Sequence, residues 1–360
     1  MGLRFTAPEG QGPGVYRPHV TPTPAHPGGS LPLPQPPQGD AEPQVTRLAP
    51  SPTGALHLGN ARTFLVNWAL ARRRGWRIVL RIEDLDGPRV KSGAIDLTLD
   101  LLEWLGLDWD QGPIVQSHDT SPYTQAMRSL TAKGLAYPSD LTRGEVEAAA
   151  SAPQEGAHEV AFPASLRPAL GPREFAPADT NWRLAVPDRP IEFVDAFAGR
   201  QARSPAHSVG DFVVWTRRGQ PSYQLAVVVD DHRQGVTQVV RGDDLLDSAA
   251  RQLLLYRALG IGPEPAYTHL PLVLGPDGRR LAKRHGDTRL DMYRARGVSR
   301  ERVIALLGRW CGLPGVHGES GGSGARLALS PAEFRDALDL NTIPRDPITF
   351  TPEDDAWLLA

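Results

Sequence analysis

A strand, a loop and a helix follow one another directly where apolar patterning begins in this 360-residue chain. A short apolar stretch over 45–49 ends at Pro50, and apolar residues then recur at helical spacing over 59–74. A second apolar stretch over 77–82 and a second helical pattern over 94–105 repeat this order. Because alternating strands and helices favour a parallel sheet with right-handed crossovers, we expect a doubly wound α/β fold.

The sheet pattern is interrupted in the middle of the chain and then resumes. Further predicted elements are a helix over 120–134, strands over 136–138, 211–215 and 237–241, and a helix over 245–259. Between them the pattern loosens into short alternating pieces, among them 183–186 and 191–194, which favours an inserted, partly β subdomain. We expect a disordered Pro- and Gly-rich tail over 1–44, sheet halves over 45–138 and 210–262, an inserted α+β subdomain over 139–209, a basic loop with a helical segment over 263–312, and a partly flexible C-terminal segment over 313–360.

The composition argues against a membrane span, an intrachain disulfide and a zinc cage made of thiolates. The chain has no run of about 18 apolar residues, no apolar core of a signal peptide, and Cys311 as its single cysteine. The net charge of -2 neither requires nor excludes a nucleic acid partner. We therefore expect a soluble protein with no membrane partner. A cytoplasmic location and a monomer are further expectations, although the sequence does not show the oligomeric state.

Two short stretches have the residue types that bind nucleotides. In the first, a strand ends in Pro50-Ser-Pro-Thr-Gly-Ala-Leu-His57-Leu-Gly59-Asn60 and a helix begins, so backbone N–H groups and the helix dipole face a bound phosphate. Gly59 lets an adenine ring approach the backbone. In the second, the basic run Arg280, Leu281, Ala282, Lys283 and Arg284 offers a mobile cation to a pyrophosphate leaving group. Taken singly, each stretch is also compatible with an ordinary turn.

Together the two stretches resemble the signature pair of class I aminoacyl-tRNA synthetases, His-Ile-Gly-His and Lys-Met-Ser-Lys-Ser. Four longer matches narrow the resemblance to the glutamyl and glutaminyl branch: Arg47-Leu-Ala-Pro-Ser-Pro-Thr-Gly, Arg81-Ile-Glu-Asp-Leu-Asp86, Tyr223-Gln-Leu-Ala-Val-Val-Val-Asp-Asp-His232 and Val240-Arg-Gly-Asp243. The resemblance covers roughly residues 45–311 and implies a Rossmann-type catalytic domain with an inserted subdomain and a C-terminal helical segment.

The chemistry of glutamate suits these residues, because its two carboxylates and one ammonium need charged partners when buried. Arg47 and Arg241 can hold carboxylates, Glu83 can hold the ammonium, and Tyr223 offers a hydroxyl and a ring. The resemblance implies a glutamate site of Arg47, Leu48, Ala49, Pro50, Ser51, Glu83, Tyr223 and Arg241. It implies an ATP site of His57, Gly59, Asn60 and Lys283, with Lys283 and His57 catalytic and with Mg²⁺ arriving together with ATP. The residues considered alone are equally compatible with surface arginines, a solvated glutamate and a core tyrosine.

The sequence also departs from the family pattern. Members of the family often carry zinc ligands with Cys-x-Cys spacing just after a tyrosine, whereas Ser139 and Leu141 follow Tyr137 here, so we expect no protein-bound zinc. Asn60 replaces the second histidine of the first signature, and Ala282 removes a hydroxyl from the second. The acidic residues Asp230, Asp231 and Asp243 are interpreted as structural and not as metal ligands.

The chain from His285 to Ala360 is too short for the anticodon-binding domain of an ordinary glutamyl-tRNA synthetase. In this the sequence resembles the glutamyl-queuosine tRNA(Asp) synthetases, which implies activation of L-glutamate by ATP without tRNA and transfer to queuosine in the anticodon stem-loop of tRNA(Asp). The segment 139–209 would then meet the RNA, with Arg183, Arg200 and Arg203 as candidate phosphate contacts or as ordinary surface charges. The alternatives are a shortened glutamyl-tRNA synthetase that charges an acceptor end, a non-catalytic tRNA-binding module and another adenylyl-transferring ligase.

Overall fold

A seven-stranded sheet lies at the centre of the protein. The computed structural model describes residues 43–53, 56–87, 90–142, 144–146, 160–177, 179–281, 288–316 and 327–360. The strands follow the order β3 (Gln111–Val115), β2 (Arg77–Ile82), β1 (Val45–Leu48), β9 (Gln238–Gly242), β10 (Ala266–Leu270), β6 (Ile191–Asp195) and β7 (Gly199–Arg203). All neighbouring pairs are parallel except β6 and β7, which are antiparallel. The predicted α/β fold with a mainly parallel sheet is confirmed.

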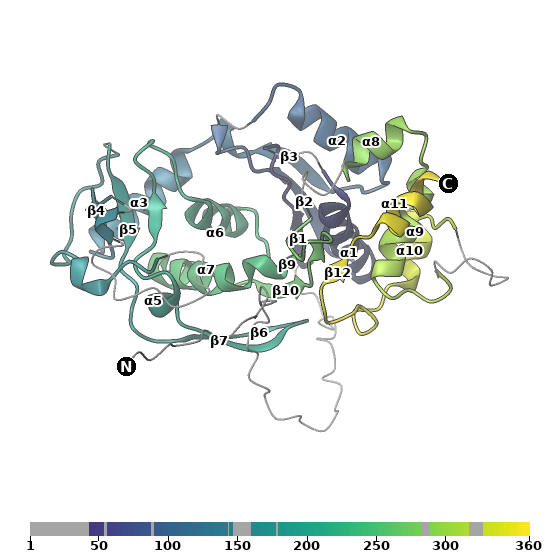
Figure 1. The fold of residues 1–360 in the computed structure, drawn as a ribbon. Helices are drawn as coiled ribbons and strands as arrows, with labels where there is room; N and C mark the ends of the chain where they lie inside the picture. Colours follow the sequence, from purple (N-terminus) through teal and green to yellow (C-terminus); the bar gives the residue numbers. More distant parts are fainter. Residues whose placement is uncertain are drawn as a thin grey trace, which may run out of the picture. The chain divides into compact units, whose positions relative to one another are not determined.

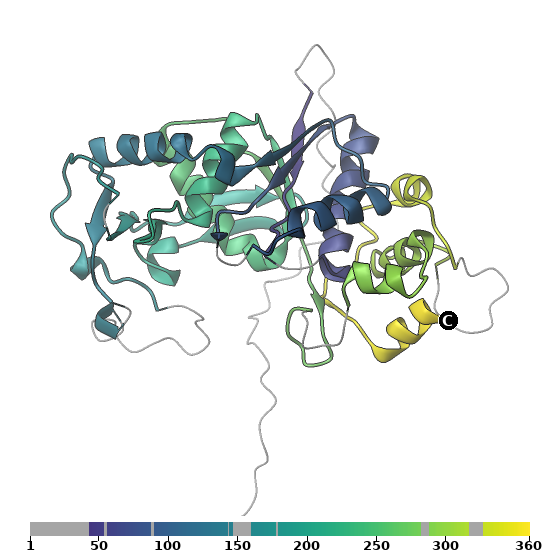
Figure 2. The same cartoon turned by 90° about the horizontal axis from the view of Figure 1, so that it is seen from above.

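Helices cover both faces of this sheet (Figures 1 and 2). One side carries α1 (Leu58–Arg74), which packs on β1, β2 and β9, followed outward by α9 (Arg300–Trp310) and α10 (Pro331–Ala337). The other side carries α6 (Tyr223–Arg233), α7 (Leu246–Leu259) and α3 (Ser121–Ala132). Other helices of the described residues include α2 (Ala94–Trp104), α5 (Pro205–Ser208), α8 (Leu290–Ala295) and α11 (Pro352–Leu359), with short 3₁₀ turns at Gln116–His118, Ala164–Leu166 and Asp243–Leu245.

Helix α1 has clear chemical signals at both ends. His57 is the N-cap, and its Nδ1 accepts a hydrogen bond from the Gly59 N–H at 3.2 Å. Gly75 ends the helix in the left-handed conformation, with φ of 67°, where a side chain would be strained. In the middle, Asn67 accepts from the Thr46 hydroxyl and donates to the Arg47 carbonyl, each at 2.9 Å. These bonds fix the helix on β1, so its N-terminus lies at the carboxyl end of that strand.

Three short strands form a separate antiparallel sheet, in the order β4 (Ala136–Ser139), β5 (Asn181–Leu184) and β8 (Val213–Trp215). The prediction that 136–138 and 211–215 belong to the main sheet is therefore wrong. Strands β6 and β7, which lie within the predicted insertion, instead extend the main sheet by pairing next to β10. Strands this short have an apolar pattern that predicts a strand but not its partners. The segment boundaries at 138/139 and 209/210 remain predictions.

Strand β3 lies at the edge of the main sheet, and the sequence patterns did not predict it. Its residues include Gly112 and Pro113, which normally indicate a turn. Proline has no N–H group, so a strand tolerates it only where no neighbouring strand needs that hydrogen bond.

Of the predicted tail over 1–44, residues 1–42 lie outside the described residues.

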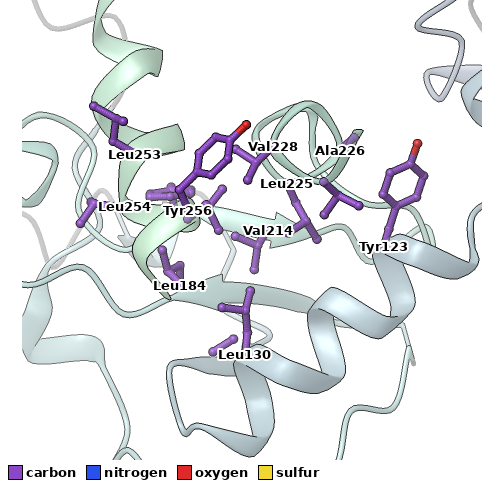
Figure 3. Close-up of a cluster of buried hydrophobic side chains, with 14 of the residues drawn as sticks. Tyr123, Leu130, Leu184, Val214, Leu225, Ala226, Val228, Leu253, Leu254 and Tyr256 are labelled. Atoms are coloured by element: carbon purple, nitrogen blue, oxygen red, sulfur yellow. The ribbon is translucent and has the colours of Figure 1, made fainter. Parts of the chain in front are cut away.

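The small sheet shares a hydrophobic core with helices of the main domain. Figure 3 shows Leu184 of β5 and Val214 of β8 facing side chains from α3, α6 and α7, among them Leu130 and Leu225. The same buried cluster reaches Val45 of the main sheet. The position of the small sheet is therefore tied to α6, which also contributes to the site described below.

The C-terminal segment holds elements that the sequence patterns did not predict. Helices α10 and α11 each begin with a capping box, formed by Ser330 with Glu333 and by Thr351 with Asp354. Strand β12 (Ile348–Thr349) pairs with β11 (Val273–Leu274). In the sequence, Ser330-Pro331 and Thr351-Pro352, each with an acidic residue at the third position after the serine or threonine, are typical of helix N-termini and could have predicted both helices.

Asp211 holds the small sheet and its connections together. It is 1% exposed and accepts hydrogen bonds from the Tyr137 hydroxyl at 2.5 Å, from two nitrogens of Arg167 at 2.6 and 2.7 Å, and from the Val186 N–H at 2.8 Å. We predict that Asp211→Ala lowers the free energy of unfolding by about 3 kcal/mol, because buried donors lose their acceptor. Urea titration measures this.

The matched control is Asp188→Ala, since the Asp188 side chain is 82% exposed and pairs with His207 at the surface. It should change the free energy of unfolding by less than about 0.5 kcal/mol. Equal losses in the two variants would contradict a special role for Asp211.

Candidate active site

A cavity of about 530 Å³ opens at the carboxyl ends of β1, β2 and β9. The chain crosses from β1 to β2 on one side, whereas β9 pairs on the other side of β1, so the cavity lies where the strand order reverses. Open α/β sheets bind ligands at such switch points. The residues that line the cavity include Arg47, Ala49, Pro50, Ser51, Thr53, His57, Gly59, Asn60, Thr63, Phe64, Glu83, Tyr223, Arg241, Asp244, Leu272, Val273 and Arg280.

The structure brings the predicted glutamate residues together, with one exception. Arg47, Ala49, Pro50, Ser51, Glu83, Tyr223 and Arg241 all line the cavity. Leu48 does not, because its side chain is fully buried in the sheet. Among the predicted ATP residues, His57, Gly59 and Asn60 line the same cavity, along the first turn of α1. Their roles toward a ligand stay predictions.

The second predicted signature is described only in part. Arg280 lines the cavity and Leu281 is buried beside it, while Ala282, Lys283 and Arg284 lie outside the described residues. A turn at 275–278, closed by the bond from the Gly278 N–H to the Gly275 carbonyl at 3.0 Å, returns the chain toward β11. The Leu281 N–H then bonds the Val273 carbonyl at 3.0 Å. The basic run therefore starts at the rim of the cavity.

A network of buried charges supports the floor of the cavity. Arg81 is fully buried and donates to Asp231 at 2.7 Å, to Gln234 at 2.8 Å and to Glu83 at 3.1 Å. Asp231 also forms an ion pair with Nε of Arg47 at 3.6 Å. Despite the cost of burial, these acids raise the pKa of Arg81, so the guanidinium stays charged. The ion pairs fix the carboxyl ends of β1 and β2 relative to α6.

Arg47 and Arg241 retain donor capacity toward the cavity. Arg47 is 5% exposed and donates from Nη1 to the Val240 carbonyl at a long 3.4 Å. Arg241 is equally buried and donates from Nε to His269 at 2.9 Å and from Nη2 to the Leu245 carbonyl at 3.3 Å. Its Nη1 has no hydrogen-bond partner among the described residues. A buried donor without a partner is costly unless a ligand satisfies it.

Glu83 and Tyr223 complete the polar wall. Burial raises the pKa of Glu83, and the charges of Arg81 and Arg47 oppose that rise. Burial and the charge of Glu83 raise the pKa of Tyr223, so its hydroxyl remains protonated. Tyr223 is 41% exposed although it begins a buried helix, because its side chain faces the cavity.

Among the described residues, the charged side chains that line the cavity leave a formal excess of one positive charge. Arg47, Arg241 and Arg280 face Glu83 and Asp244, with His57 uncharged as shown below. Arg280 and Asp244 pair at 2.5 Å, which leaves two arginines and one carboxylate on the polar wall. A ligand with two carboxylates and one ammonium has the complementary charge.

His57 is a neutral hydrogen-bond donor at the nucleotide end of the cavity. Burial, and then the nearby charge of Arg280, lower the pKa of His57 from 6.5 to about 4. Its Nδ1 accepts from the Gly59 N–H, so the ring proton is on Nε2. A Cβ on residue 59 would lie 3.1 Å from the His57 ring, which explains glycine at this position. The ring therefore presents an N–H donor beside the N-terminus of α1.

Several functional candidates were missed in the sequence. Thr63 and Phe64 lie one turn into α1, and Leu272 and Val273 follow β10; all of them line the cavity. Asp244, next to the quoted Val-Arg-Gly-Asp stretch, pairs with Arg280. Helical spacing from Asn60 would have indicated Thr63 and Phe64, whereas no local signal links Asp244 to Arg280.

The three acidic residues interpreted as structural lie in different surroundings. Asp231 belongs to the arginine network, and Asp230 accepts from Tyr123 at 2.8 Å and from Gln116 at 2.7 Å. Burial and the charge of Asp244 raise the pKa of Asp243. Within the described parts of the chain no group of three His, Cys, Asp or Glu side chains gathers as for a metal. Ser139 is 8% exposed in β4, and Leu141 packs on a small cluster with Tyr137.

The candidate phosphate contacts have separate environments. Arg183 is half-buried, donates to the Asp211 carbonyl at 2.7 Å and stacks over Phe162 at 4.1 Å. Arg203 pairs with Asp247 at 3.2 Å, and Arg200 is exposed on β7. Arg183 therefore supports the small sheet, which leaves Arg200 as the most accessible of the three.

Comparisons with known proteins show the family to which the chain belongs. Residues 44–319 match the family model described as tRNA synthetases class I (E and Q), catalytic domain. The chain belongs to this class I tRNA synthetase family and is a ligase.

Individual relatives show which members of the family the chain is similar to. The chain is 45% identical over 326 residues to the Glutamyl-Q tRNA(Asp) synthetase of Symbiobacterium thermophilum, which covers 87% of this chain and 97% of that protein. It is 39% identical over 270 residues to Glutamate--tRNA ligase 1 of Dinoroseobacter shibae, which covers 75% of this chain and 57% of that protein. The crystal structure of a glutamate tRNA ligase from Elizabethkingia meningosepticum in complex with its amino acid superposes with a TM-score of 0.71 at 27% identity, covering 88% of this chain and 69% of that one.

None of the helices in the described ranges is long and apolar enough to span a membrane.

We predict that the His57 ring stays neutral at pH 7 and gains its proton only near pH 4, as measured by ¹³C–¹H NMR with His57→Gln for assignment. The folded pKa lies below the unfolded value of about 6.5, so the unfolded chain binds more protons in between. The contribution of His57 to stability is therefore present above about pH 6.5 and is lost as the pH falls toward about 4. Titration near pH 6.5 in the folded protein would contradict this account.

Proposed function

We propose that this ligase activates L-glutamate with ATP and Mg²⁺ to glutamyl-adenylate without tRNA, and transfers glutamate to queuosine in the anticodon loop of tRNA(Asp). The observation that carries the first step is the cavity itself. It places two buried arginines and Glu83 beside the N-terminus of α1, so an amino acid with two carboxylates and a nucleotide phosphate fit side by side. We further propose that the protein acts as a monomer in the cytoplasm.

In the first step, the glutamate α-carboxylate attacks the α-phosphate of ATP and pyrophosphate leaves. Arg241 and Arg47 hold carboxylate groups, and Glu83 with the Tyr223 hydroxyl holds the ammonium. The neutral His57 donates from Nε2 toward the phosphates at the α1 N-terminus. Arg280 lines the cavity, and Lys283, three positions later in the sequence, is assigned to stabilise the charge of the departing pyrophosphate. Catalysis then rests on positioning and charge stabilisation.

In the second step, a hydroxyl of the queuosine cyclopentene-diol attacks the adenylate carbonyl and AMP leaves. Support for this acceptor comes from the relatives named Glutamyl-Q tRNA(Asp) synthetase, one of which matches over 97% of its length. We propose that the segment 139–209 meets the anticodon arm, with Arg200 as a phosphate contact.

Glutamate-dependent exchange of pyrophosphate into ATP, measured without tRNA, tests the first step. We expect exchange with glutamate and not with glutamine, because glutamine lacks the second carboxylate. Lys283→Ala should slow exchange by about 10²- to 10³-fold, while Arg279→Ala, which removes an exposed arginine four positions earlier in the sequence, should leave it near wild type. No exchange at saturating glutamate and ATP would refute the proposal.

Product analysis tests the acceptor. With radiolabelled glutamate, label should appear on queuosine-containing tRNA(Asp), should still appear when the 3′-terminal nucleotide of that tRNA has been removed enzymatically, and should be absent from tRNA(Asp) that lacks queuosine. Label that depends on an intact 3′ end would instead identify a glutamyl-tRNA synthetase that charges an acceptor end. Exchange without any labelled RNA would refute the transfer step.

A further inference from the structure

A buried carboxylate at the end of β6 lies behind the cavity. Asp195 is 1% exposed and accepts hydrogen bonds from the Phe197 N–H at 2.9 Å, the Ala198 N–H at 2.7 Å and the His269 N–H at 3.2 Å. Burial alone would raise the pKa of Asp195, but the His269 ring and these N–H groups lower it by more. The pKa is therefore below its usual value, and the carboxyl is ionised. An ionised carboxylate can only accept hydrogen bonds.

The His269 ring connects this carboxylate to Arg241. Its Nδ1 lies 2.6 Å from Asp195 Oδ2, so Nδ1 carries the proton. Burial lowers the pKa of His269, which leaves Nε2 with a lone pair. That lone pair accepts the Arg241 Nε–H at 2.9 Å. The order of donors from Arg241 to His269 to Asp195 is therefore fixed.

Arg241 is held on its remaining sides as well. Its Nη2 donates to the Leu245 carbonyl at 3.3 Å, and its guanidinium lies over the Tyr267 ring at 5.2 Å from the centroid. Tyr267 in turn stacks on the His269 ring at 5.7 Å. With Nε and Nη2 engaged, Nη1 is the nitrogen that has no partner among the described residues.

We propose that the Asp195–His269 pair is a positioning relay that orients the Arg241 guanidinium and so sets the affinity for the amino-acid carboxylate. The inference rests on the proposed function, because it assigns Arg241 to glutamate. His269 is 1% exposed and does not line the cavity, so it acts through Arg241 and does not contact the substrate. The pairing of β6 with β10 sets Asp195 opposite Tyr267 and so brings its carboxylate to His269.

Two substitutions of His269 separate a positioning role from a structural one. His269→Asn places its amide near the position of Nδ1, so it keeps the bond to Asp195 but leaves Arg241 Nε without an acceptor. His269→Gln places its amide oxygen near the position of Nε2 and retains that acceptor. In the exchange assay, the Asn variant should raise KM for glutamate about tenfold or more, with kcat and KM for ATP unchanged. In the Gln variant, KM for glutamate should return most of the way to the wild-type value.

A purely structural role would give a different result, because both variants would then lower kcat and raise both KM values together with a fall in Tm. That result, or an unchanged glutamate KM in the Asn variant, would overturn the relay while wild-type exchange upholds the proposed function. Absence of glutamate-dependent exchange in the wild type would overturn the proposed function, and the relay with it.

The tautomer of His269 gives a second readout that needs no substrate. In ¹⁵N-labelled wild-type protein, a long-range ¹H–¹⁵N spectrum should show a protonated Nδ1 and an unprotonated Nε2 for His269. A protonated Nε2 would overturn the relay even if both variants fail to fold, because Nε2 would then have no lone pair for Arg241.

Discussion

The arrangement of the site depends on the need to pair charges that are buried at the carboxyl edge of the sheet. Arg81 has no exposed surface, and Asp231, Glu83 and Gln234 surround it. An uncompensated charge at this depth would cost several kcal/mol, so these residues hold β2 against α6. Arg47 joins the same network through Asp231. The ion pairs that stabilise the fold therefore also fix the positions of the charged side chains that line the cavity.

The two ends of the cavity use different physical means. The amino-acid end offers formal charges on Arg47, Arg241 and Glu83, whereas the nucleotide end offers the N-terminus of α1 and a neutral His57. A helix N-terminus with a neutral imidazole donor attracts phosphate without adding another full charge. This division suits a reaction in which a carboxylate attacks a phosphate, because both reactants are anionic and need partners at different places.

Local sequence patterns predicted the elements better than their partners. Strand β2 and helices α1, α2 and α7 lie where apolar spacing and capping residues indicated, because those signals act within one element. The partners of β4, β8 and β6 depend on contacts far along the chain, such as Asp195 opposite Tyr267, which no local pattern encodes. For the same reason, some site residues could be predicted from the sequence and others could not. Motif matches predicted Arg47, Glu83, Tyr223 and Arg241, but His269 and Asp195 support Arg241 from distant strands and carry no motif of their own.

We infer that the charge of the cavity selects an amino acid with a second carboxylate. Isothermal titration with two non-hydrolysable sulfamoyl-adenosine analogues, one carrying glutamate and one carrying glutamine, tests it directly, because the two ligands differ only in that carboxylate. We predict that the glutamate analogue binds about tenfold or more tightly than the glutamine analogue. Equal affinities for the two analogues would contradict it.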